Sequence, residues 1–127
     1  MPLPQLPDIF IKPNGEKPME LNELYVRLGL KTLAAKEFLE LSLRHVILFD
    51  HKQLDYGPKN ISSFGTFGVV VRMNDKFERI KTLFNFGRRK RAVNESIRDT
   101  FSDVHVYALI ALMLEQGVWP TEEPPKT

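Results

Sequence analysis

Residues 68–117 read GVVVRMNDKFERIKTLFNFGRRKRAVNESIRDTFSDVHVYALIALMLEQG, which is two helical patterns joined by a short basic loop. In the first pattern, apolar residues recur every three or four positions and form one seam: Val70, Met73, Phe77, Ile80 and Phe84. In the second pattern, Glu95, Asp99 and Asp103 are four residues apart, which places three carboxylates on one side of a helix. Because like charges at this spacing repel, the pattern requires either basic side chains from a neighbouring element or a bound cation.

The composition is typical of one globular domain. With 127 residues, of which 43% are hydrophobic and 27% charged, the chain can bury a core without disulfides or metals. The absence of cysteine excludes thiol catalysis, disulfide frameworks and zinc sites built on sulfur. The N-terminal residues lack the pattern of a signal peptide, and no apolar run is long enough to span a membrane, so we expect a cytoplasmic protein without a membrane partner. The net charge of +2 is too small to indicate nucleic-acid binding.

Local signals predict the first two helices. Residues 21–29 form a short amphipathic helix that ends at Gly29. Thr32 is the expected N-cap of a long helix over residues 33–54, because its hydroxyl can accept a hydrogen bond from a first-turn amide. Gly57, followed by a proline, ends this helix.

The second half of the chain predicts two further helices. Residues 57–66 are expected to form a loop, and the third helix covers residues 67–85. Asn94 is the expected N-cap of the last helix, which continues to Gly117. The chain is therefore predicted to be all-α, a bundle of three main helices plus a short N-terminal helix.

The predicted domain covers residues 21–117 and is flanked by two proline-rich segments. Residues 1–20 contain five prolines and are expected to form an extended arm with a short strand at 8–12. Residues 118–127 form a tail that Trp119 can anchor. The helices carry apolar residues on more than one side, which predicts a homo-oligomer, a dimer in the simplest case.

Two loops are candidate ligand sites. The loop from Tyr56 to about Thr66 combines aromatic rings with small hydrogen-bonding residues, which suits a ligand loop, although connectors commonly have this composition too. Four consecutive basic residues, Arg88–Arg91, could contact the backbone of DNA or RNA, although a solvated turn is the commoner outcome for such a run.

The segments LDYGPKN, FGTFGVVVRMNDKFERI and NESIRDTFSDVHVYALIAL resemble a bacterial and phage family of unknown function, the nucleotide modification associated domain one family. The resemblance covers about residues 45–115 and includes a turn, a basic helix and an acidic helix. The positions that match it are Lys52, Asp55, Tyr56, Gly57, Arg72, Met73, Asp75, Lys76, Asn94, Glu95, Ser96, Asp99, Thr100, Asp103, Tyr107 and Ala108.

This family is in turn similar to the all-α NTP pyrophosphatases (MazG-like enzymes), which hold Mg²⁺ with a Glu-x-x-Glu helix and a Glu-x-x-Asp helix. In this chain the first motif would correspond to Asp75-x-x-Glu78, and Asp99-x-x-x-Asp103 replaces the second, so both depart from the pattern of those enzymes. Glu37-x-x-Glu40 has the first spacing but lies on the preceding helix. The resemblance implies a nucleotide-binding protein of nucleotide metabolism or modification in a bacterium or a phage-infected cell.

Two functions stay open. In a Mg²⁺-dependent nucleotide pyrophosphohydrolase, the catalytic residues would be Asp75, Glu95, Asp99 and Asp103, and the metal ligands Asp75, Glu78, Asp99 and Asp103. The nucleotide-binding residues would be Lys52, Asp55, Tyr56, Asn60, Arg72, Lys76 and Arg79. In a non-catalytic nucleotide-binding or nucleic-acid-associated protein, the same acids would instead pair with Arg72, Lys76 and Arg79.

Overall fold

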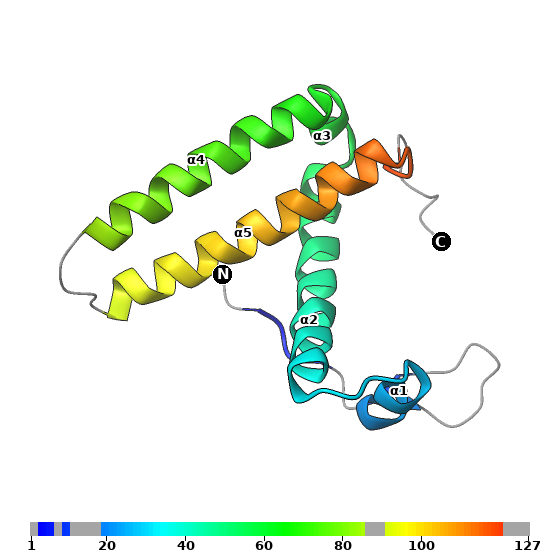
Figure 1. Ribbon diagram of the computed structural model, residues 1–127. Coiled ribbons are helices and arrows are strands. Elements are labelled where there is room, and N and C mark those ends of the chain that lie inside the picture. The colour runs from blue at the N-terminus through cyan, green and yellow to red at the C-terminus, as the bar shows by residue number, and fades with distance from the viewer. Residues whose placement is uncertain (1–2, 7–8, 11–18, 86–90, 121–127) are drawn as a thin grey trace. The chain divides into compact units, whose positions relative to one another are not determined.

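The computed structural model describes residues 3–6, 9–10, 19–85 and 91–120, and these residues form an all-α protein (Figure 1). The helices are α1 (Leu21–Arg27), α2 (Leu33–Tyr56), α3 (Lys59–Ser62), α4 (Gly65–Asn85) and α5 (Arg91–Glu115). Two strands of two residues each, β1 (Ile9–Phe10) and β2 (Met19–Glu20), pair antiparallel. None of the helices in the described residues is long and apolar enough to cross a membrane. The predicted all-α class with three main helices is confirmed.

The chain divides into two compact units, Leu3–Leu48 and Phe49–Thr127, and the boundary falls within α2. In the first unit, α1 ends in a left-handed turn at Gly29, whose φ is +69°. The Gly29 amide donates to the Val26 carbonyl and the Leu30 amide to the Tyr25 carbonyl, so the free carbonyls of the last turn are satisfied. This end of α1 agrees with the prediction.

The start of α2 also agrees with the prediction. The backbone amide of Ala35 donates to Thr32 Oγ1 at 3.1 Å, which is the expected N-cap hydrogen bond. Further along α2, the guanidinium of Arg44 donates through Nε to the carbonyl of Pro4 at 3.1 Å and ties the described part of the N-terminal arm to this helix.

The second unit is built on α4 and α5, which run side by side in opposite directions (Figure 1). Val69 of α4 and Ile97 of α5 are each only 1% exposed, and Ile110 is buried further along α5. Thr100 is also buried, and its hydroxyl donates to the Ser96 carbonyl at 2.7 Å, so this polar group is not left unsatisfied. Burial of these apolar side chains stabilises the α4–α5 pair.

Trp119 closes the core of the second unit beyond the end of α5. Its side chain is buried against Ile61 and Ile110, and its ring meets that of Phe49 edge to face at a centroid distance of 6.1 Å. The indole Nε1 donates to the carbonyl of Pro58 at 3.1 Å. The burial of Trp119 agrees with the prediction that it can act as an anchor, and its contacts connect α2 and the start of α3 to the end of α5.

Two local predictions were wrong. The expected loop over residues 57–66 contains the short helix α3, which begins directly after Pro58 because the fixed φ of proline suits the entry to a helix. Helix α5 begins at Arg91, so Asn94 lies inside its first turn and is not the N-cap. Since neither Arg91 nor Ala92 disfavours a helix, nothing delays its start until Asn94. Residues 88–90, most of the N-terminal arm and most of the tail lie outside the described residues.

Candidate functional site

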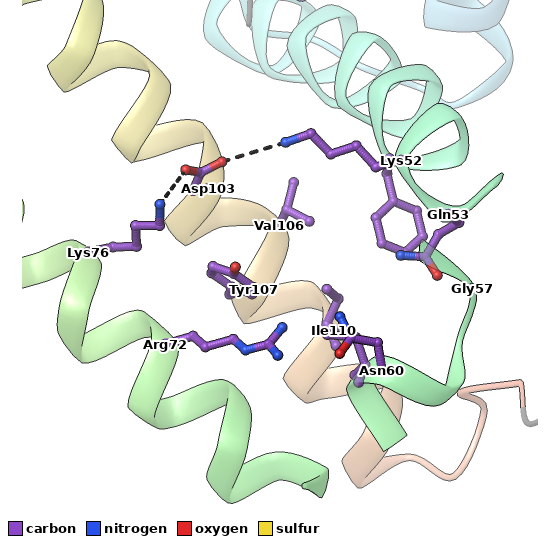
Figure 2. A pocket seen from close by; sticks show the side chains of 12 residues that line it. Lys52, Gln53, Gly57, Asn60, Arg72, Lys76, Asp103, Val106, Tyr107 and Ile110 are labelled. Atoms are coloured by element: carbon purple, nitrogen blue, oxygen red, sulfur yellow. Dashed lines mark ion pairs between the residues drawn. The ribbon is translucent and has the colours of Figure 1, made fainter. Parts of the chain in front are cut away.

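A pocket of about 370 Å³ lies in the second unit, between the last turns of α2, α3 and the facing sides of α4 and α5 (Figure 2). Its volume is near the lower end of the range of small-molecule sites, about 300–1,000 Å³. The residues that line it are Phe49, Lys52, Gln53, Gly57, Asn60, Ile61, Arg72, Lys76, Asp103, Val106, Tyr107 and Ile110.

One end of the pocket holds a carboxylate between two lysines. Lys76 Nζ of α4 lies 2.9 Å from Asp103 Oδ2 of α5, and Lys52 Nζ of α2 lies 3.8 Å from Asp103 Oδ1. Figure 2 shows both ion pairs and the three helices from which they come. The side chains of Lys76 and Asp103 are each 31% exposed and that of Lys52 is 41% exposed, so solvent and a ligand can reach all three.

Arg72 is the third cation of the pocket. It precedes Lys76 by four residues on α4, so both side chains project from the same face of this helix. Within the part of the chain that the structure describes, no carboxylate lies within ion-pair distance of Arg72. Three cationic side chains and one carboxylate therefore give the described lining residues a formal charge of +2.

The other end of the pocket is neutral and offers amides beside apolar surface. The amides of Gln53 and Asn60 line it near Gly57, where α2 gives way to α3 (Figure 2). Each amide provides both donors and an acceptor. The ring of Tyr107 and the side chains of Val106 and Ile110 provide adjacent flat and aliphatic surface from α5. A ligand with a charged end and a planar hydrogen-bonding end would match both parts of this lining.

The structure brings together five of the residues that the sequence pointed to as site residues. Lys52, Asn60, Arg72, Lys76 and Asp103 all line the pocket. They come from three helices and the α3 segment, and the sequence distance between the first and the last of them is 51 residues.

The other predicted site residues whose side chains are described do not line the pocket. Asp55, Asp75 and Asp99 are exposed on their helices. The carboxylate of Glu78 pairs with Lys81 at 3.0 Å, and Arg79 donates to Ser96 Oγ at 2.7 Å on the surface of the α4–α5 pair. The backbones of Tyr56 and Glu95 belong to α2 and α5, and their side chains lie outside the described residues.

The acids predicted as metal ligands are not gathered into one site in the described residues. No group of three or more His, Asp or Glu side chains there is placed to hold a metal ion. Asp103 is the only described carboxylate that lines the pocket, and two lysines already neutralise it. A single carboxylate that is already paired with two ammonium groups does not fit a resident Mg²⁺ ion, because the lysines would repel the cation.

The sequence interpretation missed the neutral half of the lining. Lys52 and Gln53 follow Phe49 at three and four residues, so one face of α2 carries an aromatic ring, a cation and an amide. On α5, Val106, Tyr107 and Ile110 follow Asp103 at three, four and seven residues. Their helical spacing from the predicted residues Lys52 and Asp103 is the sequence signal that could have identified these side chains.

The span of the family resemblance, about residues 45–115, contains every residue that lines the pocket. No protein-family model, curated protein or solved structure matches the chain.

Proposed function

We propose that the protein binds a small phosphorylated ligand of the nucleotide class in the pocket between α2, α3, α4 and α5. The observation that carries this proposal is the formal charge of +2 on the lining, with Arg72 lacking a carboxylate partner among the described residues. Leaving a partly enclosed cation without a counter-ion costs free energy, and an anionic ligand would supply that counter-ion.

A phosphate group suits this end of the pocket better than a single negative atom. The planar guanidinium of Arg72 can donate two parallel hydrogen bonds to phosphate oxygens. The ammonium group of Lys76 adds a point charge from the same face of α4, and that of Lys52 adds one from α2. Arginine and lysine on converging helices are thus able to contact several oxygens of one tetrahedral anion.

The neutral end of the pocket favours a nucleotide over a simple phosphate ester. A nucleobase has a flat apolar face and an edge that carries both hydrogen-bond donors and acceptors. The amides of Gln53 and Asn60 could pair with such an edge, and Tyr107 and Val106 offer surface for the face. The family resemblance implies the same ligand class, and six of the positions that match it line the pocket: Lys52, Gly57, Arg72, Lys76, Asp103 and Tyr107.

Binding, rather than hydrolysis, is the function that the geometry supports best. Hydrolysis by Asp75, Glu95, Asp99 and Asp103 with Mg²⁺ stays a prediction of the family resemblance, since Asp103 is the one of them that lines the pocket among the described side chains. Mg²⁺ usually binds through one or two carboxylates plus substrate phosphates. A metal that arrives with the nucleotide is therefore the form of the hydrolase hypothesis that remains to be tested, by product analysis with and without Mg²⁺.

The proposal is tested by titrating ribonucleoside and deoxyribonucleoside 5′-monophosphates into the protein by calorimetry. Arg72→Met removes the unpaired cation, and Arg98→Met is the matched control because Arg98 is an exposed arginine of α5 that does not line the pocket. We expect Arg72→Met to lower the affinity for the tightest-binding nucleotide at least about tenfold, because a hydrogen bond to a charged group contributes about 1.5–3 kcal/mol to binding. Arg98→Met should leave the affinity close to that of the natural protein.

Two results would overturn this proposal. One is that none of the nucleotides binds the natural protein. The other is that Arg72→Met and Arg98→Met change affinity equally, which would mean that only the overall charge of the protein attracts the ligand. If duplex DNA or RNA binds with a steep salt dependence while nucleotides do not, the basic run Arg88–Arg91 would become the preferred site.

A further inference from the structure

We infer that the pocket selects a phosphomonoester dianion over singly charged anions, and that Asp103 is a built-in counter-ion with which the ligand competes. This inference rests on the proposed function and narrows its ligand class. It also gives Asp103 a role opposite to that of a metal ligand: the carboxylate opposes the ligand instead of helping to hold it.

The geometry of Asp103 supports the counter-ion role. Both of its carboxylate oxygens face cations, Oδ2 at 2.9 Å from Lys76 Nζ and Oδ1 at 3.8 Å from Lys52 Nζ (Figure 2). The carboxylate therefore takes one of the three hydrogen bonds that the Lys76 ammonium group can donate, and it offsets the positive charge that would attract a ligand anion. The longer contact to Lys52 leaves that ammonium group less fully satisfied.

Arg72 gives an anion its first contact. Its side chain lines the pocket one helical turn before Lys76 and has no carboxylate partner in the described part of the chain. A phosphate held by Arg72 would lie next to Lys76, and binding there places the phosphate and Asp103 in competition for the same ammonium group. The ligand must therefore interact with Lys76 more strongly than the Asp103 carboxylate does.

This competition discriminates between ligands by charge. When a singly charged phosphodiester or carboxylate replaces Asp103 as the partner of Lys76, one monoanion takes the place of another and the Coulomb attraction to Lys76 does not increase. A phosphomonoester carries a charge of about −1.5 to −2 at neutral pH. Because Coulomb attraction is proportional to ligand charge, the +2 lining stabilises the dianion more strongly than it does either monoanion.

Two probes without a nucleobase isolate this effect. Phenyl phosphate is a dianion at pH 8, where the second phosphate pKa of about 6 has been passed, and methyl phenyl phosphate is the matching singly charged diester. Calorimetric titration without divalent metal, at low salt, should show the monoester binding the natural protein about tenfold more tightly than the diester.

Variants that change the pocket charge one unit at a time extend the test. Asp103→Asn raises the formal charge of the lining to +3 and should tighten the monoester severalfold while widening its preference over the diester. Arg72→Met lowers that charge to +1 and should weaken the monoester and narrow the preference. Asp50→Asn is the matched control for the first change, because Asp50 is an exposed acid of α2 that does not line the pocket.

The inference is overturned if the natural protein binds both probes equally. It is also overturned if Asp103→Asn weakens phenyl phosphate in the absence of metal, since that result would make Asp103 part of the ligand's binding set. Thermal melting shows whether Asp103→Asn is folded. Should it fail to fold, Lys52→Met, which lowers the lining charge to +1, must narrow the monoester preference, and an unchanged preference would refute the inference.

The outcomes separate this inference from the proposed function. A clear monoester preference combined with no binding of any nucleotide would overturn the nucleotide proposal alone. Nucleotide binding that depends on Arg72, with equal affinity for the phenyl monoester and diester, would overturn only the charge selection.

Discussion

The interactions of Asp103 in the structure differ from those that its sequence spacing indicates. The four-residue spacing of Glu95, Asp99 and Asp103 indicates mutual repulsion, which would be relieved by removing one charge. In the structure, Asp103 instead lies within ion-pair distance of Lys76 and Lys52. Its removal would leave two ammonium groups near each other without their shared carboxylate.

We therefore expect Asp103→Asn to lower the free energy of unfolding by up to about 1 kcal/mol, as is usual for ion pairs that solvent can reach. The loss stays small because each partner of the 2.9 Å pair is 31% exposed. Urea denaturation of the natural protein, Asp103→Asn and the control Asp50→Asn would measure it. An increase in stability would show that repulsion among the acids outweighs the pairing with lysine.

The elements meet at the site because α2 stops abruptly. Gly57 adopts a φ of +71° directly after the last residue of α2, and its amide donates to the Gln53 carbonyl at 2.9 Å. The chain then turns through Pro58 into α3, which brings Asn60 to the same pocket as Lys52 and Gln53. The end of α2 thus determines the position of the neutral part of the lining.

Gly57→Ala is expected to destabilise the protein by about 1–3 kcal/mol, because residues other than glycine are strained in the left-handed region. A Cβ at this position would meet no atom within 4 Å, so the cost comes from the backbone and not from a collision. Gly57→Asn is the matched variant, since asparagine tolerates positive φ better, and it should lose less stability in the same denaturation experiment. Equal losses for the two variants would contradict the backbone explanation.

At the scale of the whole molecule, much apolar surface remains exposed. Val70, Phe77 and Phe84 of α4 recur every seven residues and are 51%, 46% and 50% exposed. Leu109 and Leu112 of α5 are exposed to a similar degree. A helix with apolar side chains at a seven-residue period is suited to pack against another helix, and a second copy of the chain supplies one.

We expect the protein to form a homodimer through this surface of α4, as the sequence predicts. Sedimentation velocity at micromolar concentration should show a dimer, and Phe77→Glu should shift it to the monomer because the charge would be buried in the interface. A monomer at all concentrations, or a dimer that Phe77→Glu leaves unchanged, would contradict the prediction. Circular dichroism of Phe77→Glu would check that the helices persist.

The sequence by itself determined the four longer helices, although not the start of α5, because helix formation depends on residues near each other in the chain. Thr32 accepts the predicted cap hydrogen bond of α2, and glycines with positive φ follow α1, α2 and α5 at positions 29, 57 and 117. The apolar period of residues 67–85 predicted α4, whose observed bounds are Gly65–Asn85. The sequence did not predict α3, because a single helical turn is too short to show an apolar period.

Only the tertiary structure decided which polar side chains meet. Lys52 and Asp103 are 51 residues apart, and helical spacing carries no information about how α2 and α5 are placed around the pocket. The same spacing made Asp99 and Asp103 look equivalent, yet only Asp103 lines the pocket. Packing around Trp119 and Ile110 sets which turn of each helix faces the others. The physical reason is that capping and periodicity act over a few residues, whereas a site depends on long-range burial.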